Sequence, residues 1–266
     1  MATVTDPGQM FSDGEAYERL MGRWSQPVGE AFLEWLDVPK GVRWLDVGCG
    51  NGAFTEVLVK RCAPVSVAAI DPSEGQLAYA RKRPTTTMVQ FRQGDSQALP
   101  YADGSFDAVA MALVITFIPD AAKAVAEMAR VVRPGGWVGT YMWDSIAGGL
   151  PISPLHAAME SLGLPRMVQP GAANSQRDAM QQFWEKAGFQ SIETRVIRIP
   201  VVYPNFNDFW IANTAPIGPQ GKVIAELSQD AKEQLRNHVR ERLPIAADGR
   251  IAYEAFANAV KGRAPR

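Results

Sequence analysis

Three glycines at alternate positions, Gly48, Gly50 and Gly52, mark the part of this chain whose residue types and spacing best suit chemistry. The surrounding stretch is typical of a buried strand that runs into a tight turn and then a helix, and glycines there let the backbone turn sharply and approach a ligand. The start of the helix offers free backbone N–H groups, which suit an anion or a carboxylate. Asp46, two residues before the first glycine, would repel a pyrophosphate and attract an ammonium or sulfonium centre. The turn therefore indicates a nucleotide-type cofactor that carries positive charge and no phosphate.

S-adenosylmethionine (SAM) has an ammonium group, a sulfonium centre and no phosphate, and the motifs along the chain fit a family that uses it. Residues 46–52 resemble the first motif of the Rossmann-like, SAM-dependent methyltransferases. Further blocks of the family pattern follow in the expected order, at 71–73, 94–100, 105–109 and 130–136. A lone glycine turn would be a weak signal, whereas ordered blocks spread over roughly residues 15–145 are specific.

The resemblance implies where the methionine end of SAM lies. It lies over the glycine turn, in contact with Gly48, Cys49 and Gly50. Asp46 acts on its ammonium group, directly or through water, and the backbone carbonyl of Met111 at the end of the fourth strand accepts from the same group. The alternative for Asp46 is a carboxylate that caps a helix.

Two further acidic residues are expected to bind the nucleoside. Asp71 ends the second predicted strand, where Rossmann-type folds place an acidic residue on the ribose hydroxyls, and its two acceptor oxygens suit two vicinal hydroxyls. Pro72 is expected to pack against the adenine face. The resemblance implies that Asp95 accepts from the adenine amino group and that a neighbouring backbone N–H, at Ser96, donates to a ring nitrogen. The alternatives are a helix cap for Asp71 and a plain turn for Asp95.

An N-terminal segment is expected to fold over the cofactor as a helix. It contains Tyr17, Arg23 and Trp24. Arg23 would pair with the carboxylate of SAM through a charge-assisted hydrogen bond. The alternative is an exposed arginine beside a tryptophan that belongs to the core.

The sequence does not identify a general base. Methyl transfer from a sulfonium is an in-line displacement of an activated group, so the enzyme mainly aligns donor and acceptor and excludes water. Related small-molecule and quinone-type methyltransferases often carry a histidine after the fourth strand, and this chain has Thr116 and Phe117 there. His156 is the better candidate base of the two histidines, because His238 lies in a charged helix. A structural or surface role is the alternative for His156.

Aromatic residues are expected to line the pocket for the methyl acceptor. Tyr141 and Trp143 lie where the fifth strand opens toward the ligand side of the sheet, and Phe117 follows the fourth strand. Trp210 belongs to an aromatic cluster in the second half of the chain, which would cover an apolar acceptor. Packing in the core or anchoring of a cap is the alternative for these residues.

Strand-like and helix-like segments alternate through most of the chain, which predicts an α/β fold with a doubly wound, mostly parallel, seven-stranded sheet. Strands are predicted at 43–47, 65–70, 89–92, 108–114, 137–143, 192–199 and 251–260. Helices are predicted at 28–38, 51–61, 74–83, 121–132, 155–162 and 178–187. The resemblance implies that the seventh strand is antiparallel beside the sixth.

The resemblance and the composition together predict a single SAM-dependent methyltransferase domain over residues 1–266. N-terminal helices occupy 1–40, and the cofactor-binding half occupies 41–144. Helical insertions that cap the substrate occupy 145–175 and 200–248.

The composition limits the classes of binding partner and the cellular compartment that we expect for this protein. The 266 residues are 47% hydrophobic and 21% charged, with a net charge of −1, and phosphate contacts need a clustered basic excess that this balance does not offer. No apolar run approaches the roughly 20 residues of a membrane helix, and residues 1–14 lack the pattern of a secretory signal. Two cysteines and two histidines leave little material for disulfides or a metal site. We therefore expect a cytoplasmic monomer or homodimer with a small-molecule methyl acceptor, and with no nucleic acid, membrane or metal.

The expected activity is methyl transfer from SAM to an O, N or C nucleophile of a small, partly apolar or aromatic molecule, which leaves S-adenosylhomocysteine (SAH). One alternative is a non-catalytic protein of the same fold that binds SAM or SAH. Another is an NAD(P)-dependent oxidoreductase, which Asp46 and the glycine spacing disfavour, because the dinucleotide fingerprint would need a glycine in place of Ala53. Transfer of a group other than methyl from a modified SAM stays open.

Overall fold

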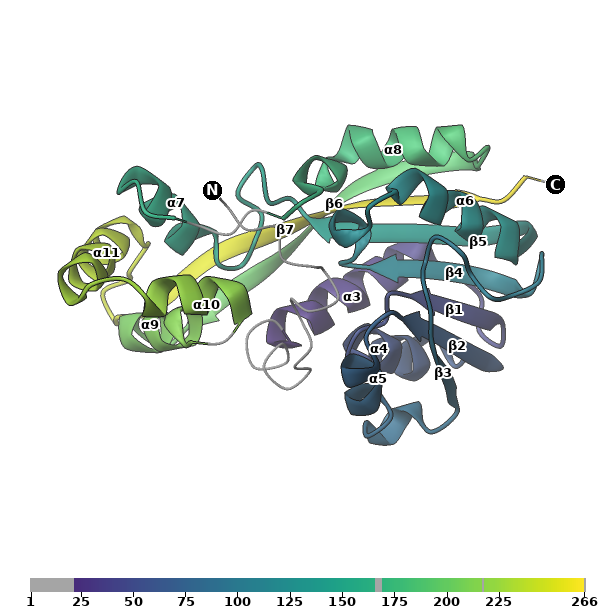
Figure 1. Ribbon diagram of the computed structural model, residues 1–266, viewed down its shortest axis with the longest axis horizontal. Coiled ribbons are helices and arrows are strands. Elements are labelled where there is room, and N and C mark those ends of the chain that lie inside the picture. Colours follow the sequence, from purple (N-terminus) through teal and green to yellow (C-terminus); the bar gives the residue numbers. More distant parts are fainter. Residues whose placement is uncertain (1–21, 166–168, 217, 266) are drawn as a thin grey trace.

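The computed structural model describes residues 22–165, 169–216 and 218–265, and a seven-stranded sheet runs through them (Figure 1). The strands lie in the order β3-β2-β1-β4-β5-β7-β6. Their bounds are β1 (Arg43–Val47), β2 (Ser66–Asp71), β3 (Val89–Gln93), β4 (Phe106–Ala112), β5 (Val132–Trp143), β6 (Gln190–Tyr203) and β7 (Ile251–Arg263). Strands β1 to β5 pair in parallel, and β7 is antiparallel to both of its neighbours, β5 and β6. This sheet confirms the predicted fold class.

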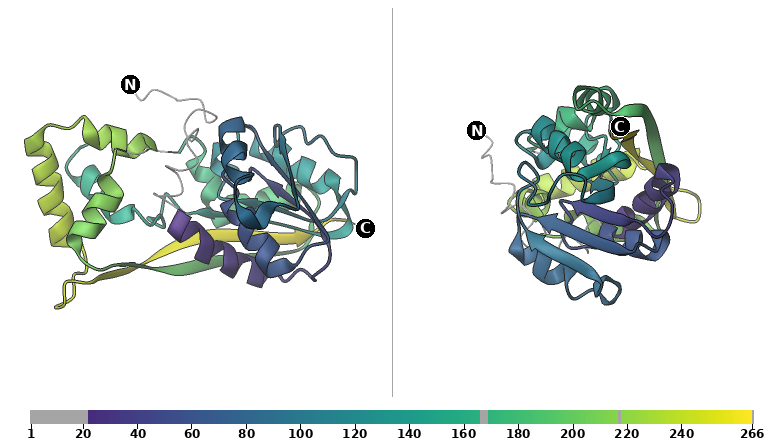
Figure 2. Two further views of the ribbon diagram at one scale, coloured as in Figure 1. Left: turned by 90° about the horizontal axis from the view of Figure 1, so that it is seen from below. Right: turned by 90° about the vertical axis from the view of Figure 1, so that its right-hand side faces the viewer.

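Helices cover both faces of the sheet (Figures 1 and 2). One face carries α3 (Arg23–Leu36), α4 (Ala53–Cys62) and α5 (Glu74–Ala80), and the other carries α6 (Ala121–Val131) and α8 (Arg177–Lys186). Short 3-10 turns complete the connections, at η2 (Pro84–Thr86), η3 (Ile115–Phe117) and η4 (Ala172–Ser175). Because both faces are covered, most residues of the central strands β1 and β4 are buried, and the carboxyl ends of the parallel strands form the edge that is open to a ligand.

Local sequence signals explain where these elements begin. The residues from Val67 to Ile70 in β2 are all buried, as a central parallel strand requires. Ser73 caps α5, since its hydroxyl accepts from the backbone N–H of Gln76 at 3.4 Å. Asp120 caps α6 in the same way, with a carboxylate that accepts from the N–H of Lys123 at 2.9 Å. Serine and aspartate are both residue types that favour this capping position.

Some strands differ in length from the prediction because pairing and backbone geometry decide their ends. Strand β4 ends at Ala112 rather than Val114, since Leu113 has a φ of +60°, which no extended strand adopts. Strand β5 begins at Val132, which pairs with Phe106 before a register shift. Strand β6 continues to Tyr203 because β7 pairs with it along that whole length.

Four helices gather beyond the far ends of β6 and β7, away from the other strands (Figures 1 and 2). They are α7 (Ser153–Ser161), α9 (Phe206–Thr214), α10 (Gly218–Ala225) and α11 (Gln229–Arg242), and we refer to them as the helical unit. Buried side chains hold the unit together, among them Leu155, Met159, Phe209, Leu235 and Val239. The side-chain amide of Gln220 on α10 also donates to the sulfur of Met159 on α7.

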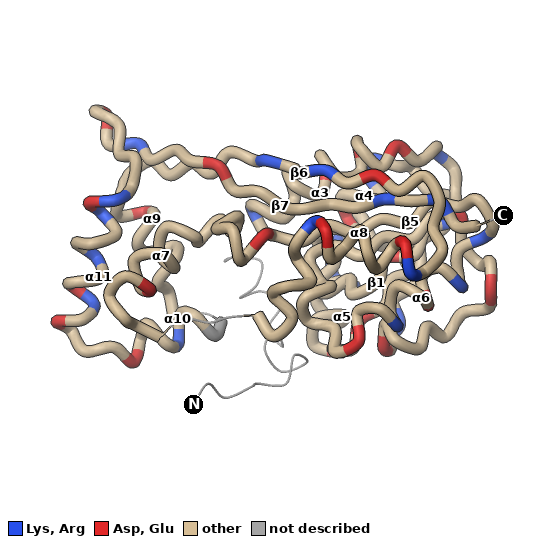
Figure 3. The backbone as a smooth tube through the Cα atoms, turned by 90° about the horizontal axis from the view of Figure 1, so that it is seen from above, with Lys and Arg blue, Asp and Glu red and all other residues tan. Residues whose placement is uncertain are grey.

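Charge is spread over the molecule. Basic and acidic residues lie interspersed along the sheet-covering helices and along α11 (Figure 3). Among the described residues, no helix combines the length and the apolar character that crossing a membrane needs.

Candidate functional site

The turn between β1 and α4 owes its shape to its glycines. Gly48, Gly50 and Gly52 have φ values of +72°, +51° and +79°, which residues with a side chain rarely adopt. Space is a second constraint: a Cβ at Gly48 would lie 2.7 Å from the side chain of Val114, and one at Gly52 would lie 3.0 Å from the Cβ of Ala80. Glycine at these positions therefore allows both the turn and the close packing of its neighbours.

Asp71 joins the end of β2 to this turn. One carboxylate oxygen accepts from the backbone N–H of Gly50 at 2.8 Å, and the other accepts from the N–H of Ser73 at 2.9 Å. Burial raises the pKa of Asp71 above its ordinary value, and the two N–H donors act in the opposite direction. The carboxylate is thus fixed at the ligand edge of the sheet while it keeps lone pairs for further donors.

Asp46 lies in β1, two residues before Gly48, and is fully buried. Its Oδ2 accepts from the hydroxyl of Thr55 at 2.6 Å, whereas its Oδ1 has no hydrogen-bond partner among the described residues. Burial raises the pKa of Asp46 to about 7, the Thr55 hydrogen bond opposes that shift, and the nearby charge of Asp71 adds to it. A buried carboxylate with an unpaired oxygen is costly, so a cationic or hydrogen-bonding group near Asp46 would be stabilised.

A cavity of about 510 Å³ opens at the carboxyl ends of β1, β2, β3 and β4. The turns after these strands supply much of its lining, namely Gly48, Cys49, Asn51, Pro72, Ser73, Gly94, Asp95, Ser96 and Gln97, and Ser25 of α3, Asp71 of β2 and Gln76 of α5 add further polar side chains. Asp95 is exposed, and its carboxylate accepts from the N–H of Gln97 at 2.8 Å. None of the described residues that line the cavity is Lys, Arg or His.

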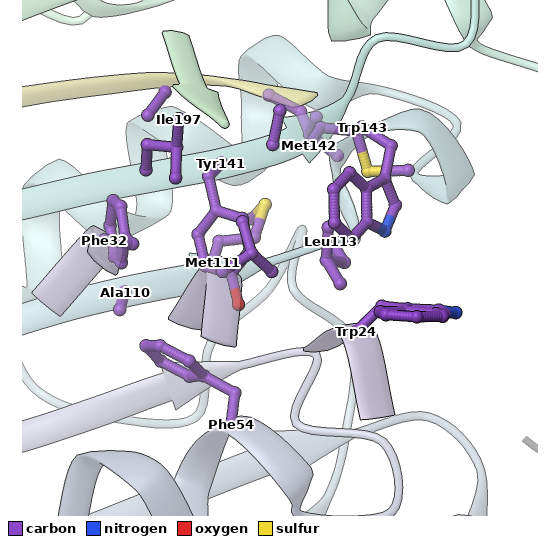
Figure 4. Close-up of a cluster of buried hydrophobic side chains, with 14 of the residues drawn as sticks. Trp24, Phe32, Phe54, Ala110, Met111, Leu113, Tyr141, Met142, Trp143 and Ile197 are labelled. Atoms are coloured by element: carbon purple, nitrogen blue, oxygen red, sulfur yellow. The ribbon is translucent and has the colours of Figure 1, made fainter. Parts of the chain in front are cut away.

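Aromatic and aliphatic side chains line the rest of the cavity. Phe117 comes from η3, Phe54 from the first turn of α4, and Tyr141 from β5. Tyr141 packs against Phe32 and Phe54, with ring centroids 4.7 and 5.8 Å away (Figure 4). The cavity therefore brings together polar groups that suit a nucleoside and an apolar surface that suits a second, less polar molecule.

Other residues proposed from the sequence lie outside the cavity lining. The carbonyl of buried Met111 accepts from the hydroxyl of Thr140 at 2.6 Å. Trp143 is buried at the end of β5, and its indole Nε1 has no hydrogen-bond partner among the described residues. Gly50 also lies outside the lining, although its N–H binds Asp71.

Arg23, Trp210 and His156 also lie outside the cavity lining. The guanidinium of Arg23 lies 4.5 Å from the ring centroids of both Trp24 and Tyr203, so it joins α3 to β6. Trp210 on α9 stacks on Phe206 in the helical unit, with centroids 6.3 Å apart, and His156 lies on α7. Tyr17 lies outside the described residues.

Several residues of the cavity lining were not proposed from the sequence, among them Asn51, Phe54 and Gln76. Phe54 and Gln76 occupy the first turns of the helices that follow β1 and β2. Their place in the predicted helices could have identified them, because the first turn of a helix after a parallel strand faces the ligand edge of the sheet.

Comparison with known proteins agrees with this geometry. Residues 45–139 match the family described as a methyltransferase domain. An uncharacterized protein of Mycobacterium tuberculosis is 35% identical over 117 residues, which cover 44% of this chain and 43% of that protein. Demethylmenaquinone methyltransferase of Staphylococcus aureus is 40% identical over 106 residues, which cover 39% of this chain and 44% of that protein. The match thus spans less than half the length of these curated relatives.

The fold also resembles a solved structure along nearly all of its length. Phosphoethanolamine N-methyltransferase 2 of Haemonchus contortus, in complex with SAM, superposes with a TM-score of 0.60 and 22% sequence identity. The alignment covers 95% of this chain and 56% of that protein. The likeness shows a common fold.

Proposed function

Residues 45–139 form a class I, SAM-dependent methyltransferase domain, and on that premise we propose that the chain transfers the methyl group of SAM to a small, partly apolar or aromatic molecule. The observation that carries the proposal is the cavity itself. It combines the glycine turn and two carboxylates with an apolar wall formed by Phe54, Phe117 and Tyr141. The polar part of the cavity thereby suits the cofactor, and the adjoining apolar wall suits the acceptor.

The residues present fit SAM, which carries two cationic centres and no phosphate. Asp71 and Asp95 supply negative charge at the cavity, and the described lining residues include no cationic side chain that a phosphate would call for. The unpaired Oδ1 of buried Asp46 suits a nearby ammonium group. A pyrophosphate-bearing dinucleotide fits this arrangement less well.

Several polar groups hold different parts of the cofactor. Asp71 accepts from the ribose hydroxyls while it keeps Gly50 in place. Asp95 and Ser96 bind the adenine edge, and Pro72 packs on its face. The carbonyl of Met111 keeps a second lone pair beside its Thr140 hydrogen bond.

Methyl transfer to the acceptor depends more on the shape of the acceptor pocket than on proton transfer. SAM supplies an activated methyl group, so the protein aligns the acceptor and excludes water. Phe117 and Tyr141 form the apolar surface on which the acceptor lies. Segments 145–175 and 200–248, which include all four helices of the helical unit, act as the substrate cap, with Trp143 and Trp210 on the acceptor side. One observation favours this role for the helical unit. Strand β7 follows α11 directly in the chain and pairs with β5 at Tyr141 and Trp143.

Parallel calorimetric titrations with SAM, SAH and NADH test the cofactor assignment. We expect binding of SAM and SAH and no binding of NADH. Binding of NADH alone would contradict the proposal. Transfer of labelled methyl groups from SAM to a panel of small phenols, amines and enolisable ketones then tests catalysis. A protein that binds SAM and methylates no member of a broad panel would instead support the non-catalytic alternative.

A further inference from the structure

Arg83 reaches the glycine turn from a part of the chain that the cofactor motifs do not include. It lies between α5 and η2, and its side chain is only 11% exposed. Its Nε donates to the backbone carbonyl of Asn51 at 2.7 Å, and its NH1 donates to Oε2 of Glu56 at 2.7 Å. One guanidinium therefore bridges the turn and the first turns of the helix that follows it.

Glu56 holds the other end of this bridge in place. Its carboxylate also accepts from Lys60 at 2.7 Å and from Thr85 at 2.9 Å. Burial favours the neutral form, but the hydrogen bonds from Lys60, Arg83 and Thr85 outweigh it and lower the pKa of Glu56 to about 2. Glu56 is thus ionised at neutral pH and fixes the orientation of the guanidinium.

Hydrogen bonds fix the glycine turn from two sides. On the β2 side, the carbonyl of Ile70 accepts from the N–H groups of Gly48 and Cys49 at 2.8 and 3.0 Å, and Asp71 accepts from Gly50. On the α5 side, the hydrogen bond from Arg83 holds Asn51, which itself lines the cavity. A Cβ at Gly52 would lie 3.4 Å from Cδ of Arg83, so the side chain is packed against the turn as well as bonded to it.

We propose that Arg83 is a positioning residue for cofactor binding. It acts through Asn51, because Arg83 itself does not line the cavity. By fixing the Asn51 carbonyl it sets the backbone of the turn in the conformation that receives the cofactor, before the cofactor arrives. The role requires an arginine, since a planar guanidinium offers two donors in a fixed geometry and a lysine ammonium is a single flexible point charge. This inference rests on the proposed function.

The test compares Arg83→Lys and Arg83→Met with two controls. Thr85→Val removes one donor to Glu56 and leaves the bond from Arg83 to Asn51 in place. Arg61→Met removes an arginine on α4 whose guanidinium pairs with Glu34 and not with the turn. For each variant we would measure the Kd for SAM by calorimetry, the melting temperature, and the rate of backbone hydrogen exchange across residues 48–53 without added ligand.

Both Arg83 variants should bind SAM about tenfold more weakly, which is the effect of losing one charge-assisted hydrogen bond. Exchange across the turn should be faster in both, and both controls should match the wild type in Kd and exchange. Failure of lysine to rescue binding would separate positioning from a purely electrostatic pairing with Glu56.

Other outcomes would overturn the inference. Wild-type affinity in either Arg83 variant would do so, as would weakened binding in Thr85→Val of the same size as in Arg83→Met. If the wild type itself does not bind SAM, the proposed function fails. The exchange rates then decide the Arg83 inference separately, since unchanged exchange at the turn in Arg83→Lys would contradict it.

Discussion

The carboxylate of Asp71 accepts a hydrogen bond of 2.8 Å from the backbone N–H of Gly50, so the end of β2 is tied directly to the turn after β1. These two positions are 21 residues apart in the chain and meet because β1 and β2 are parallel neighbours. Under the proposed function, Asp71 both shapes the turn and contacts the ribose. Substitutions at Asp71 therefore test both the shape of the turn and the contact with the ribose.

Asp71→Asn is expected to weaken SAM binding by about 1–3 kcal/mol. The amide replaces one acceptor oxygen with an N–H donor, which would face either the Gly50 N–H or the Ser73 N–H. Calorimetric titration measures the loss. Asp103→Asn serves as the control, because that carboxylate is 80% exposed and pairs with Arg130 away from the cavity. An unchanged Kd in a folded Asp71→Asn protein would count against the ribose assignment.

Asp46→Asn is expected to change how stability depends on pH in the protein without ligand. The pKa of Asp46 rises from an ordinary value of 3.8 to about 7 on folding, so the folded state holds a proton that the unfolded state has released. This group therefore makes stability fall as the pH rises from about 4 to about 7. Relative to the wild type, the Asn variant should gain melting temperature between pH 5 and pH 8. A difference in melting temperature that stays constant over this range would contradict the buried-carboxyl account.

The same carboxyl should link SAM binding to proton release. An ionised Asp46 attracts the ammonium group, so binding favours the charged form and the affinity should rise with pH up to about 7. Calorimetry at pH 6.5 in two buffers of different ionisation enthalpy counts the protons released. The Asp46→Asn protein should release fewer protons, and equal release by both proteins would place the linkage elsewhere.

Phe117→Ala is expected to raise the KM for the methyl acceptor while the Kd for SAM stays within about twofold. Phe117 contributes to the apolar wall of the cavity, and its removal takes away contact area without touching the carboxylates. Steady-state kinetics with saturating SAM, beside calorimetry for SAM alone, separates the two effects. Val65→Ala, at a site between α4 and β2 that is 64% exposed, is the matched control. A larger effect on SAM than on the acceptor would place Phe117 at the cofactor instead.

His156→Ala is expected to keep kcat within about tenfold of the wild type, because α7 carries this residue in the helical unit and it does not line the cavity. The measurement is kcat at saturating SAM and acceptor. A loss of several orders of magnitude with an intact Kd for SAM would identify His156 as the general base after all.

The sequence predicted the sheet well where local signals decide it. Apolar runs such as 67–70 mark strands that are buried on both faces, and Ser73 and Asp120 cap helices as their residue types favour.

Other features depend on contacts between distant segments, which a single sequence does not record. The full length of β6 follows from its pairing with β7, and the bridge from Arg83 to Asn51 joins residues 32 positions apart. The placement of Trp210 in the helical unit, stacked on Phe206, depends likewise on how α9 packs. Strands and turns are therefore more directly predictable from a single sequence than contacts between distant side chains.

The position of β7 has a consequence for the order in which the chain folds during synthesis. This strand separates β5 from β6 and pairs with both, yet the ribosome makes it after β6 and after all four helices of the helical unit. Until Ile251–Arg263 emerges, β6 has no neighbour in the sheet and β5 presents an open apolar edge. Nascent chains that stall before Ile251 should consequently expose aggregation-prone strand edges and depend on chaperones, while the parallel β1–β5 core is already able to form.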